Sequence, residues 1–186
     1  SEFMLQQTQV ATVIPYFNRF IKYIPNLKVL AQYDDQKLIK LWEGLGYYSR
    51  VKNLKKTAQI IIKDFNKSLP DNLLDLKSLP GIGDYTASAI MAIAFNKPII
   101  PLDGNIERVL KRYLYLKNEN QIHKDNLIKQ KKIFGTSLRS SDYAQALMEL
   151  GALICKPINP YCERCPISGK CKSFKKKDFV LTKFKK

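Results

Sequence analysis

Residues 79–88, "LPGIGDYTAS", contain the turn that decides the fold. Gly81 and Gly83 permit positive φ and leave backbone N–H groups uncovered, and the helix expected to follow adds the positive end of its dipole. Such a turn can hold a phosphate group without reading a base sequence. The five residues of "LPGIG" fit an ordinary helix–helix turn equally well, with glycines for close packing. Tyr85 stands just inside the predicted helix.

Helical periodicity surrounds this turn on both sides. In residues 49–65 a single apolar stripe of Val51, Leu54, Ala58, Ile61 and Phe65 follows Ser49, a predicted cap. Strand alternation is missing. The sequence therefore predicts an all-α protein of eight to ten helices, in which 79–83 joins two of them in the pattern of a helix-hairpin-helix. The other predicted helices are a capped one at 34–46 stopped by Gly44 and Gly46, a buried one at 84–95, an amphipathic one at 105–116 and a last one at 141–155.

The composition points to a folded, strongly basic protein. Hydrophobic residues make up 45% of the 186 residues, and 32 Lys and Arg face 16 Asp and Glu, which gives a formal charge of +16. A polyanion is the simplest partner, with nucleic acid ahead of an anionic membrane, although a lysine-rich proteome would give the same excess. Since no apolar run could span a membrane and no export signal is visible, we expect no membrane association and a cytoplasmic location, nucleoid-associated in a bacterium.

The four cysteines form the strongest local signal. Residues 155–171 hold Cys155, Cys162, Cys165 and Cys171 in the order C-x(6)-C-x(2)-C-x(5)-C. The intracellular expectation disfavours a disulfide knot. Four thiolates suit a tetrahedral zinc ion, although zinc sites usually present two close pairs and this order has only one. A [4Fe–4S] cluster fits the ligand chemistry as well, and the spacing leaves both metals open.

Several motifs together resemble one family over essentially the whole chain. They are "SEFMLQQTQVATVIPYF" (1–17), "LWEGLGYYSRVKNL" (41–54), "LPGIGDYTASAI" (79–90), "PLDGNIERVL" (101–110), "ALMELGALIC" (146–155) and the four-cysteine loop. The sequence is similar to MutY-type adenine DNA glycosylases of the helix-hairpin-helix superfamily, which includes endonuclease III. This resemblance implies a six-helix barrel plus a small iron–sulfur module, and it favours the [4Fe–4S] cluster over zinc.

The resemblance also implies an organisation of the chain. Residues 1–134 would form the six-helix barrel, with the helix-hairpin-helix at about 69–95. Residues 135–174 would hold the last helices and the [4Fe–4S] loop, and 175–186 a basic tail or linker. The chain opens without an initiator Met inside an apolar pattern. We therefore expect a fragment without the family's preceding helix and without its C-terminal domain that reads 8-oxoguanine.

Four residues match the catalytic positions of the family. Alone, Asp103 would be taken for a helix N-cap. The resemblance makes it the carboxylate that stabilises positive charge on the deoxyribose, with Asn105 positioning it. Glu2 matches the general acid that protonates adenine, although a terminal glutamate would otherwise be taken for a surface residue. Tyr85 occupies the position that carries the Schiff-base lysine in the lyases of this superfamily.

Further residues match DNA-contacting and base-contacting positions. Removing a base requires its extrusion from the stack, which is helped by groups that fill the gap. Gln7 and Tyr47 resemble those wedges, although Tyr47 and its neighbour Tyr48 also suit a core. The other DNA-binding candidates are Gln6, Leu45, Gly81, Gly83, Lys156, Arg164, Lys170 and Lys172. The base-pocket candidates are Leu5, Val10 and Glu149. His123, the only histidine, is predicted to be a surface residue with no role.

The function implied is a monofunctional adenine DNA glycosylase of base excision repair. It would act as a monomer on double-stranded DNA, removing adenine mispaired with 8-oxoguanine or guanine and leaving an abasic site. Three alternatives stay open. They are an endonuclease III-like glycosylase with lyase activity, a mismatch thymine glycosylase, and a non-catalytic DNA-binding module. The absent lysine disfavours the first, "LQQTQVATVIPYF" disfavours the second, and the retained Glu2 and Asp103 disfavour the third.

Overall fold

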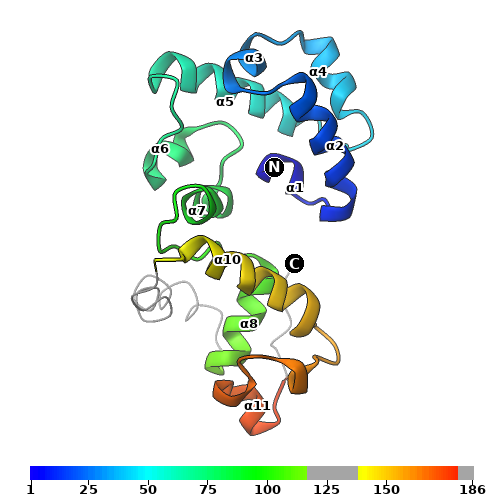
Figure 1. The fold of residues 1–186 in the computed structure, drawn as a ribbon, viewed down its shortest axis with the longest axis vertical. Helices are drawn as coiled ribbons and strands as arrows, with labels where there is room; N and C mark the ends of the chain where they lie inside the picture. The colour runs from blue at the N-terminus through cyan, green and yellow to red at the C-terminus, as the bar shows by residue number, and fades with distance from the viewer. Residues whose placement is uncertain (117–137, 180–186) are drawn as a thin grey trace. The chain divides into compact units, whose positions relative to one another are not determined.

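The computed structural model describes residues 1–116 and 138–179. The chain divides into two compact units, residues 1–87 and 88–186 (Figure 1). Within the described ranges the regular structure is helical and contains no strand, which confirms the all-α prediction. No helix in these ranges is both long enough and apolar enough to cross a lipid bilayer. The domain boundary predicted at 134 and the side chain of His123 lie outside the described residues.

The first unit holds six helices and the start of a seventh. The six are α1 (Glu2–Leu5), α2 (Val10–Tyr23), α3 (Leu27–Gln32), α4 (Asp35–Trp42), α5 (Ser49–Asp64) and α6 (Leu73–Ser78). The seventh, α7, spans Asp84–Ile93, and its first turn belongs to this unit. Helix α5 packs against α1, α3 and α4. The fully buried Trp42 lies edge-on to Phe20 at 6.1 Å between ring centroids, so the two aromatic rings join α4 to α2.

Side-chain caps explain where several of these helices begin. The Asp34 side chain accepts the Lys37 amide at 2.9 Å, which confirms the predicted start of the helix at 34–46. On α5 the predicted stripe is confirmed at Val51, Ala58 and Ile61, which are buried. The predicted Ser49 cap is wrong, because Tyr48 is already in helical conformation and Ser49 therefore lies inside the helix, with no side-chain cap bond at this end.

The glycine turn joins α6 to α7. Asn72 caps α6 by accepting the Asp75 amide at 2.9 Å. Leu79 and Ile82 are buried and anchor the turn, while Gly81 between them is exposed and has φ +78°. A side chain at Gly81 would be strained, because a Cβ there would also lie 2.8 Å from the Phe3 ring. The turn therefore depends on glycine both for its backbone conformation and for packing against α1.

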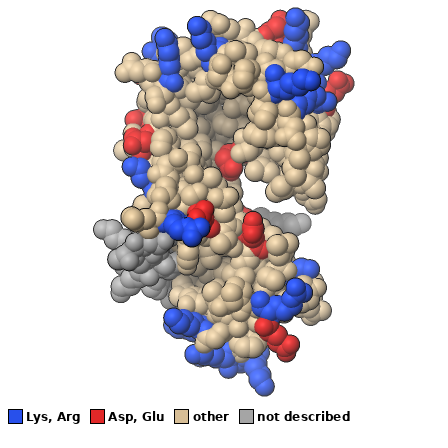
Figure 2. Space-filling view, viewed as in Figure 1, with Lys and Arg blue, Asp and Glu red and all other residues tan. Residues whose placement is uncertain are grey.

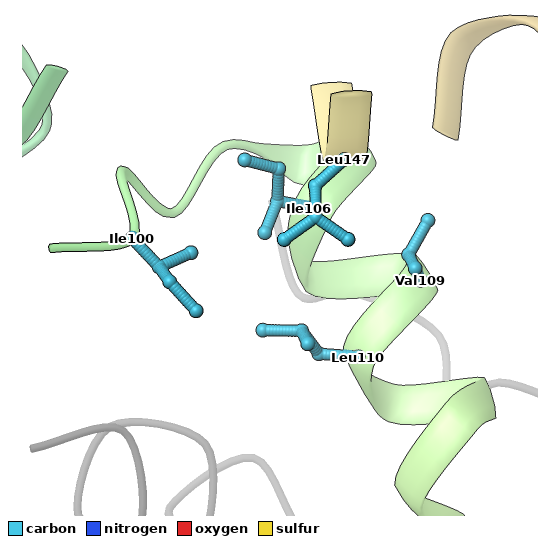
Figure 3. Close-up of a cluster of buried hydrophobic side chains, with 5 residues drawn as sticks. All are labelled: Ile100, Ile106, Val109, Leu110 and Leu147. Atoms are coloured by element: carbon cyan, nitrogen blue, oxygen red, sulfur yellow. The ribbon is translucent and has the colours of Figure 1, made fainter. Parts of the chain in front are cut away.

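The second unit is built around α8 (Gly104–Leu114). It also contains the rest of α7, α10 (Ser140–Glu149), a π-helix η1 (Leu150–Ile154), short 3-10 turns η2 (Cys162–Arg164) and η3 (Ser168–Lys170), and α11 (Lys172–Lys176). Helix α8 contacts α10, η1 and α11. Figure 3 shows its apolar core, formed by Ile100, Ile106, Val109, Leu110 and Leu147. Residues 175 and 176, predicted to be tail, belong to the last turn of α11.

The predicted amphipathic helix at 105–116 buries charge as well as apolar surface. Arg108, Lys111 and Arg112 are all buried on α8. Lys111 pairs with Glu107 one turn earlier at 2.9 Å, and the two arginines donate to backbone carbonyls of the segment that follows α10. Arg108 and Arg112 thus hold the backbone of residues 151–157 against α8.

Candidate functional site

In the first unit, the turn with Gly81 and Gly83 is joined to the N-terminal segment. The Gln6 side-chain amide donates to the Gly81 carbonyl at 3.0 Å and to the Thr86 hydroxyl at 3.2 Å. Gly83 is exposed directly before α7, and a Cβ there would meet nothing within 4 Å. The turn therefore combines uncovered backbone with a helix start, the arrangement that suits a phosphate group. Gln6 fixes the turn through its amide nitrogen.

The other candidates of the N-terminal segment differ in exposure. Glu2 and Leu5 on α1 are half-buried, while Gln7 and Val10 are exposed. Gln7 has φ 55°, a left-handed conformation that is uncommon for a residue other than glycine. In this segment Glu2 therefore lies on helix α1, and Gln7 lies after the helix in a strained backbone conformation.

The loop between α4 and α5 presents the aromatic side chains of Tyr47 and Tyr48 to solvent, which does not fit the core packing considered for them, and it buries Leu45. Tyr47 has φ 47° and is 62% exposed, whereas Leu45 is only 6% exposed. Leu45 packs in the core, so its side chain would have to leave the core to contact DNA. The Leu45 carbonyl accepts a hydrogen bond from Arg50, a buried residue that the sequence analysis did not indicate. Tyr85 is exposed in the first turn of α7.

In the second unit, Asp103 caps α8. Its Oδ1 accepts the Ile106 amide at 2.7 Å, and its Oδ2 accepts the Asn105 side-chain amide at 3.3 Å. The structure therefore brings Asp103 and Asn105 together, and both carboxylate oxygens have a donor. The side chain is half-buried. An acidic group at this end of a helix is also stabilised by the helix dipole.

Arg108, one turn into α8, extends this group of contacts. Its Nη2 donates to the Asn105 Oδ1 at 2.8 Å and to the Gly151 carbonyl at 2.6 Å, and its Nε donates to the Cys155 carbonyl at 2.7 Å. Burial is the main cause that lowers the pKa of the Arg108 guanidinium from its ordinary value. The sequence did not indicate this residue, because an arginine on an amphipathic helix usually faces solvent.

The four cysteines are free thiols that line one cavity of the second unit. Arg112 lines it too, with its Nη1 3.5 Å from the Cys155 Sγ, and the Cys171 thiol donates to the Arg112 carbonyl at 3.5 Å. Burial first, and then the neighbouring thiols led by Cys155, raise the pKa of Cys162. Across the described ranges no set of three or more Cys, His, Asp and Glu side chains is placed to hold a single metal ion.

Basic residues border this cysteine loop. In the second unit Lys and Arg side chains gather around α11 (Figure 2). Arg164, Lys170 and Lys172 are exposed, while Lys156 is half-buried with its Nζ 4.7 Å from the centroid of the Tyr161 ring. Arg164 and Glu149 line a second cavity, which is otherwise mostly apolar. Glu149 and Arg164, assigned to different tasks from the sequence, thus share one cavity.

Comparison with protein families places the chain in a repair superfamily. Residues 1–131 match the model of the HhH-GPD superfamily base excision DNA repair proteins. This match covers more than half of the chain, so the protein belongs to that superfamily. The adenine DNA glycosylase of Buchnera aphidicola subsp. Baizongia pistaciae is 44% identical over 174 residues, which are 94% of this chain and 50% of that protein. The chain spans about half the length of the curated relatives it matches.

Solved structures share the fold. A thermostable thymine-DNA glycosylase superposes with a TM-score of 0.81 at 27% identity, over 94% of this chain and 82% of that chain. A non-covalent endonuclease III–DNA complex gives a TM-score of 0.75 at 23% identity, over 95% of this chain and 82% of that chain. At this identity the similarity shows a shared fold only. The helix-hairpin-helix glycosylase fold expected from the sequence is confirmed.

Proposed function

We propose that this chain is the catalytic part of a monofunctional adenine DNA glycosylase, which hydrolyses the N-glycosidic bond of adenine mispaired with 8-oxoguanine or guanine. The observation that carries the proposal is the Asp103 carboxylate, whose two oxygens are fixed by the Ile106 and Asn105 donors at the start of α8. The family membership and the 44% identity to an adenine DNA glycosylase support the same reaction. It would take place on intracellular double-stranded DNA, with the protein acting as a monomer.

Each candidate residue has a chemical task in this reaction. Breaking the bond builds positive charge on the deoxyribose, which the Asp103 carboxylate would stabilise, and Asn105 would hold that carboxylate in place. Glu2 would protonate the leaving adenine. Tyr85 supplies no amine, so water would complete the reaction and leave an abasic site without a strand break. Gly81 and Gly83 would hold a backbone phosphate, and Gln7 and Tyr47 would fill the gap left by the extruded base.

The cysteine loop suits a [4Fe–4S] cluster. Four free thiols that line one cavity fit a group with four cysteine ligands, and the family resemblance favours the [4Fe–4S] cluster over zinc. Cys155, Cys162, Cys165 and Cys171 would hold it, and its positive irons would stabilise thiolates whose mutual repulsion otherwise opposes ionisation. The cluster would order the loop that carries the phosphate-contact candidates Lys156 and Arg164.

A single-turnover assay tests the proposal. The 186-residue chain is incubated with duplexes that contain adenine opposite 8-oxoguanine, adenine opposite guanine, or thymine opposite guanine, with Asp103→Asn as the inactive control. Strand breaks that appear only after alkali, and only on the adenine duplexes, are the expected result. Breaks without alkali would indicate a lyase instead. Release of thymine rather than adenine would favour the activity named for the thymine-DNA glycosylase that shares the fold.

A further inference from the structure

Two loops of the first unit carry strained residues with exposed side chains. Gln7 follows α1 with φ 55°, and Tyr47 precedes α5 with φ 47°. The left-handed region costs about 1–2 kcal/mol for a residue with a Cβ, so each conformation needs support from its surroundings. Both side chains are exposed, so neither is held in place by burial in the core. The support has to come from the backbone on either side of them.

Arg50, in the first turn of α5, contacts the backbone of both loops. Its Nη1 donates to the carbonyls of Met4 at 2.7 Å and Gln6 at 2.5 Å, and to the Thr8 hydroxyl at 3.0 Å. Its Nη2 donates to the carbonyls of Leu45 at 3.0 Å and Gly46 at 3.2 Å. Acceptors therefore lie directly before and directly after Gln7, at Gln6 and Thr8, and directly before Tyr47, at Gly46.

The surroundings of Arg50 are those of a fixed clamp. The side chain is 6% exposed, and its guanidinium lies 5.5 Å from the Trp42 ring centroid and 5.4 Å from that of Tyr47. A guanidinium is planar and presents its donors in a fixed fork, so the two groups of carbonyls are held at a set spacing. A lysine at this position would place one ammonium on a flexible stem and could not serve both groups in the same geometry.

We infer that Arg50 is a positioning residue that sets the distance between the Gln7 and Tyr47 wedges, and thereby supports extrusion of the target base rather than cleavage of its bond. The inference rests on the proposed function, because that function supplies the substrate, a duplex from which one base is turned out. Base extrusion from a paired duplex costs several kcal/mol, and it costs least where the base is already unpaired. A clamp on the wedges should therefore matter for a paired target and hardly matter for an unpaired one.

The experiment compares Arg50→Lys and Arg50→Met with the unsubstituted chain on two substrates. One is the duplex with adenine opposite 8-oxoguanine, and the other carries the same adenine in an unpaired bulge. We expect single-turnover excision from the duplex to fall by about 10- to 100-fold, the effect of leaving one or two buried carbonyls unpaired. Excision from the bulge should fall less than about threefold. Lys55→Met is the matched control, because Lys55 lies on the same helix and binds the Tyr33 carbonyl and Asp35, away from both loops.

Two further measurements separate positioning from a general loss of structure. A 2-aminopurine placed beside the target reports unstacking by fluorescence, and its rise on protein binding should shrink in the Arg50 variants, whether or not excision occurs. In the double variant Arg50→Lys with Tyr47→Ala, the loss of duplex rate should be smaller than the product of the two single losses, because part of the Arg50 effect acts through the Tyr47 wedge.

Equal losses on duplex and bulge, or additive losses in the double variant, would overturn the inference. An unchanged duplex rate and fluorescence rise in Arg50→Lys would overturn it too. If the unsubstituted chain excises from neither substrate, the proposed function fails, while the fluorescence comparison still decides the positioning of the wedges.

Discussion

Replacing Gly151 by alanine adds one methyl group between η1 and the start of α8. A Cβ at Gly151 would lie 2.6 Å from the Asn105 Cβ and 2.8 Å from the Asn105 carbonyl oxygen, against the 3.4 Å at which ordinary contact begins. The backbone has to shift by about 0.8 Å to restore an ordinary contact distance, since neither Asn105 atom lies at the flexible end of a side chain. Overpacking of this kind costs about 1–3 kcal/mol, and the better helix propensity of alanine returns up to about 1 kcal/mol. We expect a net loss of about 1–2 kcal/mol.

The consequences can be measured in two ways. For a chain of this length each kcal/mol shifts the melting temperature by about 2–4 °C, so Gly151→Ala should melt roughly 2–8 °C lower. Asn105 would move by a large part of the same 0.8 Å, and since a misplacement of about 1 Å can cost 100-fold in rate, we expect excision to slow by about 10- to 100-fold. Gly169→Ala is the control, because a Cβ there meets nothing within 4 Å. A Gly151→Ala protein that melts and reacts like the unsubstituted chain would refute the reasoning.

Three other outcomes are expected. Asp103→Asn should change the free energy of unfolding by no more than about 0.5 kcal/mol, since asparagine caps a helix as well as aspartate does. It should lower the excision rate by about 100-fold or more, because the charge that stabilises the transition state is lost. Urea unfolding measures the first effect and single-turnover kinetics the second. Gly81→Ala should lose about 1–3 kcal/mol of stability and weaken DNA binding in a salt titration, because φ is +78° there, whereas Gly83→Ala should keep its stability. Cys165→Ser should lose most of its bound iron and its visible absorption, and a preparation rich in zinc without iron would contradict the cluster.

The sequence predicts the helices well where one local rule acts. The Asp34 cap, the apolar stripe of α5 and the buried α7 each follow from spacing and composition within one helix. Ser49 shows the limit of such rules. A serine caps a helix only where its own backbone is not yet helical, and here the helical conformation already includes Tyr48.

The site is predicted less completely, for a physical reason. The four cysteines stand out because their type and spacing are those of ligating groups, whereas Asp103 and Asn105 are indicated only by the family resemblance. Arg50 and Arg108 do not stand out, because their role is to bind carbonyl groups that are distant in the sequence. A backbone carbonyl has no residue-specific signal. Buried cations of this kind become visible only when the chain is folded.

The wide turn of the π-helix η1 places one residue more between α10 and the cysteine loop than an α-helical turn would hold. Its last turn is closed by the Cys155 amide, which donates to the Leu150 carbonyl at 2.7 Å, a ring one residue wider than that of an α-helix. Deleting one residue there would let the Cys155 amide close an α-helical turn on the same Leu150 carbonyl, so Cys155 would stay on the side of the other three thiols. Homologous chains should therefore tolerate the loss of one residue at 150–154, as well as changes of length in the exposed stretch at 157–159.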